Sequence, residues 1–165
     1  VLENAIAELF ETIKDKKAEL HFKQLPKVKG VVFQLNQLFI NLISNSLKYS
    51  KENSNPIIKI ESHKVSAEND DKLPKNDKRK FHKISFTDNG IGFNQEHAEQ
   101  IFNLFQRLHG KTDYPGTGVG LAICKKIVDN HKGYIFEYLI SSFERSLIIL
   151  VVILDNVDLL DVLNL

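Results

Sequence analysis

Methionine is absent from this sequence, and cysteine occurs only once, as Cys124. A single cysteine excludes a disulfide within the chain and fits a reducing, cytoplasmic setting. The longest apolar run, residues 147–154, is far shorter than the roughly 20 residues that a membrane span requires. That run instead predicts a buried strand. Because the chain starts at Val1 and contains no methionine, we expect it to be a piece of a longer protein.

An excess of charge of either sign is also lacking. The 22 Lys and Arg residues nearly balance the 21 Asp and Glu residues, which leaves a net charge of +1. No global field therefore favours binding to nucleic acid, and we expect membrane contact, if any, only through segments outside this chain. The length of 165 residues and the hydrophobic fraction of 42% suit one globular domain over 1–165.

Apolar periodicity predicts an alternation of helices and strands along the chain. We expect helices over 1–17, 33–49, 96–105 and 119–131. Gly133 would close the last of these helices. The apolar stripe of the first would consist of Leu2, Ile6, Leu9 and Ile13. We expect strands over 19–23, 57–61, 81–87, 134–140 and 146–154. The charged stretch 62–80 predicts a solvated hairpin loop. This pattern favours an α/β fold, with a mixed sheet covered by helices on one face.

The helix over 33–49 carries polar residues beside a predicted buried stripe. That stripe consists of Leu35, Leu38, Phe39, Leu42, Ile43 and Ser46. Asn41, Asn45 and Lys48 are spaced four and three residues apart, so their side chains share one side of the helix and border a cavity. Asparagine carbonyl oxygens are suitable ligands for Mg²⁺, and a neighbouring lysine can neutralise phosphate. A polar helix edge without a ligand is the alternative interpretation.

Asp88 stands at the end of a predicted strand and is followed by Gly90 and Gly92. An ionised aspartate is only an acceptor, which suits the exocyclic amine of adenine. The two glycines allow positive φ angles and a close approach of the backbone to a flat ligand. An ordinary Asp-Asn-Gly turn is the alternative.

A glycine-rich segment, Gly116, Thr117, Gly118 and Gly120, leads into the first turn of the predicted helix over 119–131. Free amides at a helix N-terminus form an anion site, and glycine removes side chains that would block phosphate. The segment is neither a Walker loop nor a convincing dinucleotide fingerprint. A glycine-rich hinge is the alternative.

The stretch before that segment combines an apolar anchor around Phe102 with the basic residues Arg107, His109 and Lys111. We interpret 94–116 as a mobile lid that carries positive charge to a bound phosphate chain. Packing of the same loop on the core is the alternative.

At these residues the sequence resembles the ATP-binding catalytic domain of sensor histidine kinases, in the superfamily of gyrase, Hsp90 and mismatch-repair ATPases. The resemblance rests chiefly on residues 37–50 (QLFINLISNSLKYS) and 114–123 (YPGTGVGLAI), and it extends over about residues 1–135. It implies a two-layer α/β sandwich, with a mixed, mostly antiparallel sheet packed on three main helices and a mobile ATP lid over 94–116. Residues 1–17 would be the linking helix region.

The resemblance implies a role for each matching position. Asn45 would coordinate Mg²⁺ with support from Asn41, and Lys48 would contact phosphate. Tyr49 would pack near adenine, and Asp88 would accept from its amine, with Gly90 and Gly92 shaping the pocket. Further nucleotide contacts would come from Arg107, Lys111, Gly116, Thr117, Gly118, Gly120 and Leu121.

Asn41 separates transfer from hydrolysis within this superfamily. The hydrolysing members carry a glutamate at that position as a general base, whereas an asparagine cannot accept the proton. The resemblance therefore implies transfer of the γ-phosphate of ATP to a histidine. None of the six histidines here has the usual phosphoacceptor context. The expected partners are a dimerisation domain that holds the acceptor, upstream of Val1, and a response regulator.

The resemblance weakens toward the C-terminus. Lys132 replaces the first glycine of the pair that usually follows the last helix, and the stretch after Phe136 departs further. In one interpretation, residues 155–165 form an atypical tail with a short amphipathic helix. In the other, residues 149–165 resemble the opening strand and helix of a receiver domain, with Ile153 and Leu154 in place of its usual acidic pair. Two alternatives to the kinase remain: a degenerate interaction module without ATP turnover, and an ATPase of the same superfamily.

Overall fold

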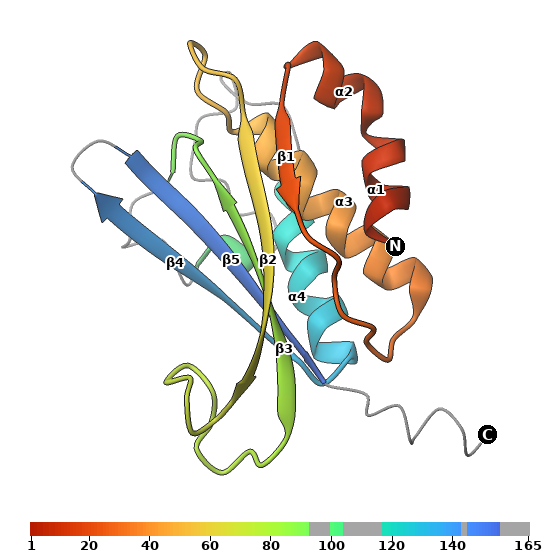
Figure 1. The fold of residues 1–165 in the computed structure, drawn as a ribbon, viewed down its shortest axis with the longest axis vertical. Coiled ribbons are helices and arrows are strands. Elements are labelled where there is room, and N and C mark those ends of the chain that lie inside the picture. The colour runs from red at the N-terminus through yellow and green to blue at the C-terminus, as the bar shows by residue number, and fades with distance from the viewer. Residues whose placement is uncertain (93–99, 104–116, 143–144, 156–165) are drawn as a thin grey trace.

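The computed structural model describes residues 1–92, 100–103, 117–142 and 145–155, in which five strands form one sheet (Figure 1). The strands are β1 (Glu19–Phe22), β2 (Ile57–Ser66), β3 (Lys80–Asp88), β4 (Tyr134–Ser142) and β5 (Arg145–Asp155). Their order across the sheet is β1-β2-β3-β5-β4. β1 and β2 are parallel, and all other neighbours are antiparallel. The predicted mixed, mostly antiparallel sheet is confirmed.

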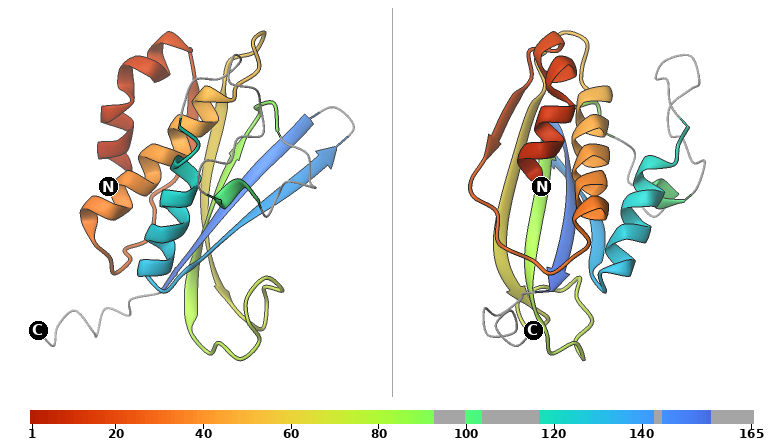
Figure 2. Two further views of the ribbon diagram at one scale, coloured as in Figure 1. Left: turned by 180° about the vertical axis from the view of Figure 1, so that it is seen from behind. Right: turned by 90° about the vertical axis from the view of Figure 1, so that its right-hand side faces the viewer.

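Helices cover one face of this sheet, as the views in Figure 2 show. Those within the described residues are α1 (Leu2–Glu8), α2 (Phe10–Asp15), α3 (Val32–Lys48) and α4 (Gly120–Asn130). The predicted two-layer α/β sandwich is therefore confirmed. In the described part of the chain, no helix has the length and apolarity needed to cross a membrane.

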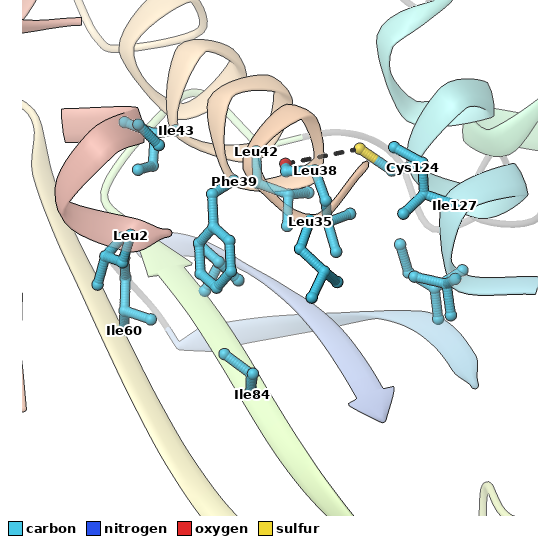
Figure 3. Close-up of a cluster of buried hydrophobic side chains, with 14 of the residues drawn as sticks. Leu2, Leu35, Leu38, Phe39, Leu42, Ile43, Ile60, Ile84, Cys124 and Ile127 are labelled. Atoms are coloured by element: carbon cyan, nitrogen blue, oxygen red, sulfur yellow. Dashed lines mark hydrogen bonds between the residues drawn. The ribbon is translucent and has the colours of Figure 1, made fainter. Parts of the chain in front are cut away.

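The main core lies between α3, α4 and the sheet. Every residue of the predicted α3 stripe is buried: Leu35, Leu38, Phe39, Leu42, Ile43 and Ser46. Figure 3 shows Phe39 and Leu35 pointing from α3 toward the sheet, while Cys124 of α4 approaches the α3 backbone. The Cys124 Sγ lies 4.0 Å from the Leu38 carbonyl oxygen. Burial raises the pKa of this thiol to about 12, so it serves as a packing group.

A histidine that directly follows α4 caps the start of α3. The residue before α3 is Val31, whose side chain cannot cap a helix. Its backbone N–H donates instead to His131 Nε2 at 2.9 Å. The other ring nitrogen, Nδ1, lies 2.7 Å from the Ile127 carbonyl oxygen, so the neutral ring donates there and accepts at Nε2. The end of α4 is thus tied to the beginning of α3.

The prediction of one continuous helix over 1–17 is wrong, because the structure has two helices there. Leu9 has φ −96° and ψ 7°, which departs from helical geometry and divides the segment into α1 and α2. Hydrogen bonds still run through the break, from Leu9 N–H to Ala5 O and from Ile13 N–H to Leu9 O. The predicted apolar stripe is retained, because Leu2 is buried and Ile6, Leu9 and Ile13 pack against the core.

The predicted solvated loop over 62–80 is also wrong. β2 continues to Ser66 and β3 begins at Lys80, so both strands are longer than expected. The connection between them forms a second apolar cluster, in which Ala67, Leu73 and Phe81 are buried. Lysines and aspartates dominate this stretch of sequence and obscured the two apolar residues that anchor it.

The end of α4 departs from the prediction in one detail. Gly133 was expected to close the helix, but the left-handed residue is Lys132, with φ 54°. The Gly133 N–H donates to Val128 O and the Lys132 N–H donates to Asp129 O, each at 2.9 Å. This is the Schellman arrangement, with a lysine at the position that glycine usually fills.

Candidate active site

The C-terminal half of α3 faces the start of α4. Asn41 Nδ2 donates to the Gly120 carbonyl oxygen at 3.4 Å, and Gln37 Nε2 donates to Asn41 Oδ1 at 3.1 Å. One helical turn on, the Asn45 carboxamide makes no hydrogen bond to any other described residue. A Cβ placed on Gly120 would lie 3.8 and 3.9 Å from its Nδ2 and Oδ1 atoms. Glycine therefore leaves free space beside Asn45.

Lys48 and Tyr49 form a pair at the end of α3. The Lys48 Nζ donates to the Tyr49 hydroxyl oxygen at 2.9 Å and lies 4.5 Å from the centre of the same ring. Both side chains are half-buried. A phosphate near α3 would compete for this amine, because an anion is a stronger acceptor than a phenol.

Asp88 ends β3 beneath α3, and the residue is buried, with 8% of its surface exposed. Oδ1 accepts from the Gly90 N–H at 2.9 Å, and Oδ2 accepts from the Ser46 hydroxyl at 2.7 Å. Burial raises the pKa of Asp88, while these two hydrogen bonds oppose the shift. Each carboxylate oxygen keeps a lone pair for a ligand.

The turn after Asp88 packs directly on the end of α3. The Ile91 N–H donates to the Tyr49 carbonyl oxygen at 2.9 Å. A Cβ on Gly90 would lie 2.6 Å from that oxygen, so no larger residue fits there. Gly92 has φ 71°, as predicted, whereas Gly90 is not among the left-handed residues. The need for glycine at position 90 is therefore close contact and not positive φ.

The structure covers part of the predicted phosphate segment. Gly118 has φ 74°, Thr117 is exposed, and Leu121 is half-buried against the core. Arg107, Lys111 and Gly116 lie outside the described residues. So do most of the predicted lid over 94–116 and most of the predicted helix over 96–105, of which residues 100–102 form a short 3-10 turn. The geometry thus brings together the predicted residues of α3, the Asp88 turn and the start of α4.

The donor chemistry of this region suits one weakly held hard cation. In the described part of the chain, no three His, Cys, Asp or Glu residues gather as a metal site. A protein site with a single neutral oxygen, the Asn45 carboxamide, matches the way Mg²⁺ is held when phosphate oxygens and water complete its octahedron. The residues present therefore fit Mg²⁺ that arrives with a nucleotide.

Two residues of the site were not predicted to act there. Ser46 was expected only as part of the buried stripe, yet it holds Asp88. Asn89 accepts from the Ile57 N–H at 2.8 Å and donates to the Asn55 carbonyl oxygen at 3.0 Å, which fixes the Asp88 turn to β2. A hydroxyl within an aliphatic stripe was the available signal for Ser46, because buried polar groups require partners.

Comparisons with known proteins agree with this geometry. The family model described as histidine kinase-, DNA gyrase B-, and HSP90-like ATPase matches residues 30–147. The chain is 39% identical over 136 residues to phytochrome-like protein Cph1 of Synechocystis, covering 82% of this chain and 16% of that protein. It is 38% identical over 135 residues to cyanobacterial phytochrome A of Nostoc, with the same 82% and 16% coverage. The chain thus spans a small part of these relatives.

Solved structures share the fold. The mycobacterial sensor histidine kinase MprB superposes with a TM-score of 0.73 at 18% identity, covering 93% of this chain and 92% of that chain. The catalytic domain of histidine kinase ThkA gives a TM-score of 0.70 at 22% identity, covering 93% and 89%. The chain therefore belongs to the histidine kinase-, DNA gyrase B- and HSP90-like ATPase family, as an ATP-binding catalytic domain of the sensor histidine kinase type.

Proposed function

We propose that this domain binds Mg-ATP and donates the γ-phosphate to a histidine on a dimerisation domain that this chain does not contain. The signal would then pass to a response regulator, as in two-component systems. One observation carries the proposal: a single helix, α3, presents Asn41 and Asn45 to the start of α4 and holds Asp88 through Ser46. Asn45, the expected metal ligand, and Asp88, the expected acceptor for the adenine amine, are thereby both attached to α3.

Each residue of this arrangement has a chemical task in the proposal. Asp88 accepts a hydrogen bond from the exocyclic amine of adenine, beside the ring of Tyr49. Lys48 leaves the Tyr49 hydroxyl and contacts phosphate oxygens. The backbone amides at the start of α4, around Gly118 and Gly120, bind phosphate with help from the helix dipole. Asn45 would hold Mg²⁺, which neutralises phosphate charge when bound. Thr117 and Leu121 would border the same space.

The environment of Asn41 favours transfer over hydrolysis. Its carboxamide is engaged at both ends, by Gln37 and by Gly120, and it has no basic atom that could take a proton from water. It positions the start of α4 and leaves the γ-phosphate for an acceptor on another domain. Arg107, Lys111 and Gly116 would add contacts from the lid. A setting in the cytoplasm, where ATP is abundant, fits this function.

Nucleotide titration in the presence of Mg²⁺ tests the first step. We expect saturable ATP and ADP binding by the isolated chain, measured by calorimetry or by thermal shift. Absence of binding at millimolar nucleotide would leave a degenerate interaction module as the better explanation. Steady ATP turnover by the chain alone would instead favour an ATPase.

Phosphoryl transfer tests the second step and requires a supplied dimerisation domain from a relative. We expect Asn45→Ala to abolish transfer of labelled phosphate to that domain. Asn130→Ala, the same change at an exposed site near the end of α4, serves as the matched control and should transfer normally. Unchanged transfer by Asn45→Ala would refute the metal-ligand role.

A further inference from the structure

Ser46 and Asp88 form a buried pair in which the proposed function gives Ser46 no chemical task beyond holding Asp88. Both residues are buried, at 7% and 8% exposure. The Ser46 Oγ lies 2.7 Å from Asp88 Oδ2 and 3.3 Å from the Leu42 carbonyl oxygen. A hydroxyl has one proton, and a carboxylate at the shorter distance is the stronger acceptor. The Ser46 proton therefore points at Asp88.

We infer that Ser46 is a positioning residue for purine selectivity: its hydroxyl keeps Asp88 an acceptor-only carboxylate, so that the site takes 6-amino purines and rejects 6-oxo purines. The inference rests on the proposed nucleotide site. A 6-amino purine donates from its exocyclic nitrogen, whereas a 6-oxo purine presents an acceptor oxygen. A carboxylate accepts a hydrogen bond from the 6-amino group and repels the 6-oxo oxygen. A neutral carboxylic acid carries a proton and can donate it in a hydrogen bond to the 6-oxo oxygen.

The protonation of Asp88 depends on few groups. Burial favours its neutral form and raises its pKa, and only the hydrogen bonds from Ser46 and from the Gly90 N–H act in the opposite direction. The Gly90 amide belongs to the backbone and persists in any variant. Ser46 is therefore the side chain that decides how far the carboxylate stays ionised.

The other groups around Asp88 do not substitute for Ser46. The strand partners of Asp88 are Ile58 on β2 and Ile148 on β5. At the end of α3, the titratable groups are Lys48 and Tyr49, which hydrogen bond to each other. No charged neighbour in the described part of the chain contributes to the shifted pKa of Asp88. Loss of the Ser46 hydroxyl should therefore raise the pKa of Asp88 further.

The test compares ATP with inosine triphosphate, which carries an oxo group in place of the 6-amino group. Dissociation constants are measured between about pH 6 and about pH 8 for the wild type, Ser46→Ala and Ser46→Thr. The wild type should hold a constant preference for ATP. Ser46→Ala should bind ATP about tenfold more weakly, as when one charge-assisted hydrogen bond weakens, and its preference should fall as the pH drops. Ser46→Thr should restore both.

A purely structural tether would give a different result. Ser46→Ala would then lower stability without changing the ratio of the two dissociation constants at any pH, and this outcome overturns the inference. Carbon-13 NMR titration of the Asp88 carboxyl provides a readout without ligand, with a higher pKa expected in Ser46→Ala. Should alanine prevent folding, Ser46→Cys retains a side chain of similar size with a weak donor. The ratio of the dissociation constants for ATP and inosine triphosphate in that variant then tests the inference. Failure of the wild type to bind ATP would refute the proposed nucleotide site instead.

Discussion

Replacing Asp88 by asparagine separates the folding role of this residue from its binding role. In Asp88→Asn, the remaining Oδ1 can still accept from the Gly90 N–H, now 2.9 Å away. The new Nδ2 can donate to the Ser46 Oγ at 2.7 Å, and the Ser46 proton can turn to the Leu42 carbonyl oxygen at 3.3 Å. Every buried polar group keeps a partner, and no buried charge remains.

The direction of the stability change follows from linkage. The pKa of Asp88 is raised in the folded protein, so the folded state binds this proton more tightly than the unfolded chain. Wild-type stability therefore falls as the pH rises from about 3.9, the unfolded pKa of aspartate, through the higher folded value. Asp88→Asn lacks this loss. We expect it to be at least as stable as the wild type at neutral pH, with the advantage vanishing in acid.

The effect on nucleotide binding has the opposite sign. The variant presents an amide N–H₂ to the adenine amine, so a donor meets a donor and a charge-assisted hydrogen bond is lost. Such a bond contributes about 1.5–3 kcal/mol. This range corresponds to an increase of about tenfold to about 150-fold in the dissociation constant of ATP.

Calorimetric titration with Mg-ATP and urea unfolding of the same sample measure both effects. Asp71→Asn, at a fully exposed aspartate in the β2–β3 connection, is the matched control and should bind ATP normally. Wild-type affinity in Asp88→Asn would refute base recognition by Asp88. A loss of more than about 2 kcal/mol in stability would refute the rearranged network, because it would imply an unpaired buried group.

Further substitutions test other parts of the structure. Lys132→Gly should stabilise the protein by about 0.5–1 kcal/mol in urea unfolding, because glycine adopts the φ of 54° without steric cost; an unchanged midpoint would contradict this explanation. Gly90→Ala should unfold the turn and abolish ATP binding, whereas Gly120→Ala should fold normally and weaken only Mg-ATP binding, as circular dichroism and calorimetry would show. Equal behaviour of the two variants would contradict the closer packing around Gly90. Asp77, whose pKa is lowered chiefly by the Arg79 guanidinium, stabilises the fold above about pH 4 and less as the pH falls toward its lower folded value. Asp77→Asn should therefore cost about 1–2 kcal/mol at neutral pH and little in strong acid, measured by thermal unfolding across pH; a pH-independent difference would contradict the ion pair.

Long apolar stripes made α3 and α4 predictable from the sequence almost to the residue. The stripe of α3 from Leu35 to Ile43 has only one helical solution that buries all its members. The β2–β3 connection was not predictable in the same way. Its fold depends on Phe81, which faces the side of the sheet away from α3, and on two apolar residues, Ala67 and Leu73, within a charged stretch. Local composition outweighed that sparse signal.

The candidate site was predictable wherever its residues share one element. The spacing of Asn41 and Asn45 placed both on one side of α3, and the structure sets both against the start of α4. The contact between Ser46 and Asp88 joins residues 42 positions apart in the sequence. No local pattern contains such a pairing, because it arises only when α3 packs across the end of β3.

The residues from Asn41 to Tyr49, which directly follows α3, span eight residue steps, or about 12 Å at 1.5 Å per residue. A helix buried along one side does not stretch, so the backbone separation between Asn41 and Tyr49 is fixed within the domain. Any adjustment to ligands of different length must occur in the partners of α3, at the Asp88 turn or at the start of α4. Nucleotides with shortened or extended phosphate chains should therefore perturb NMR signals near Gly120 far more than those along α3.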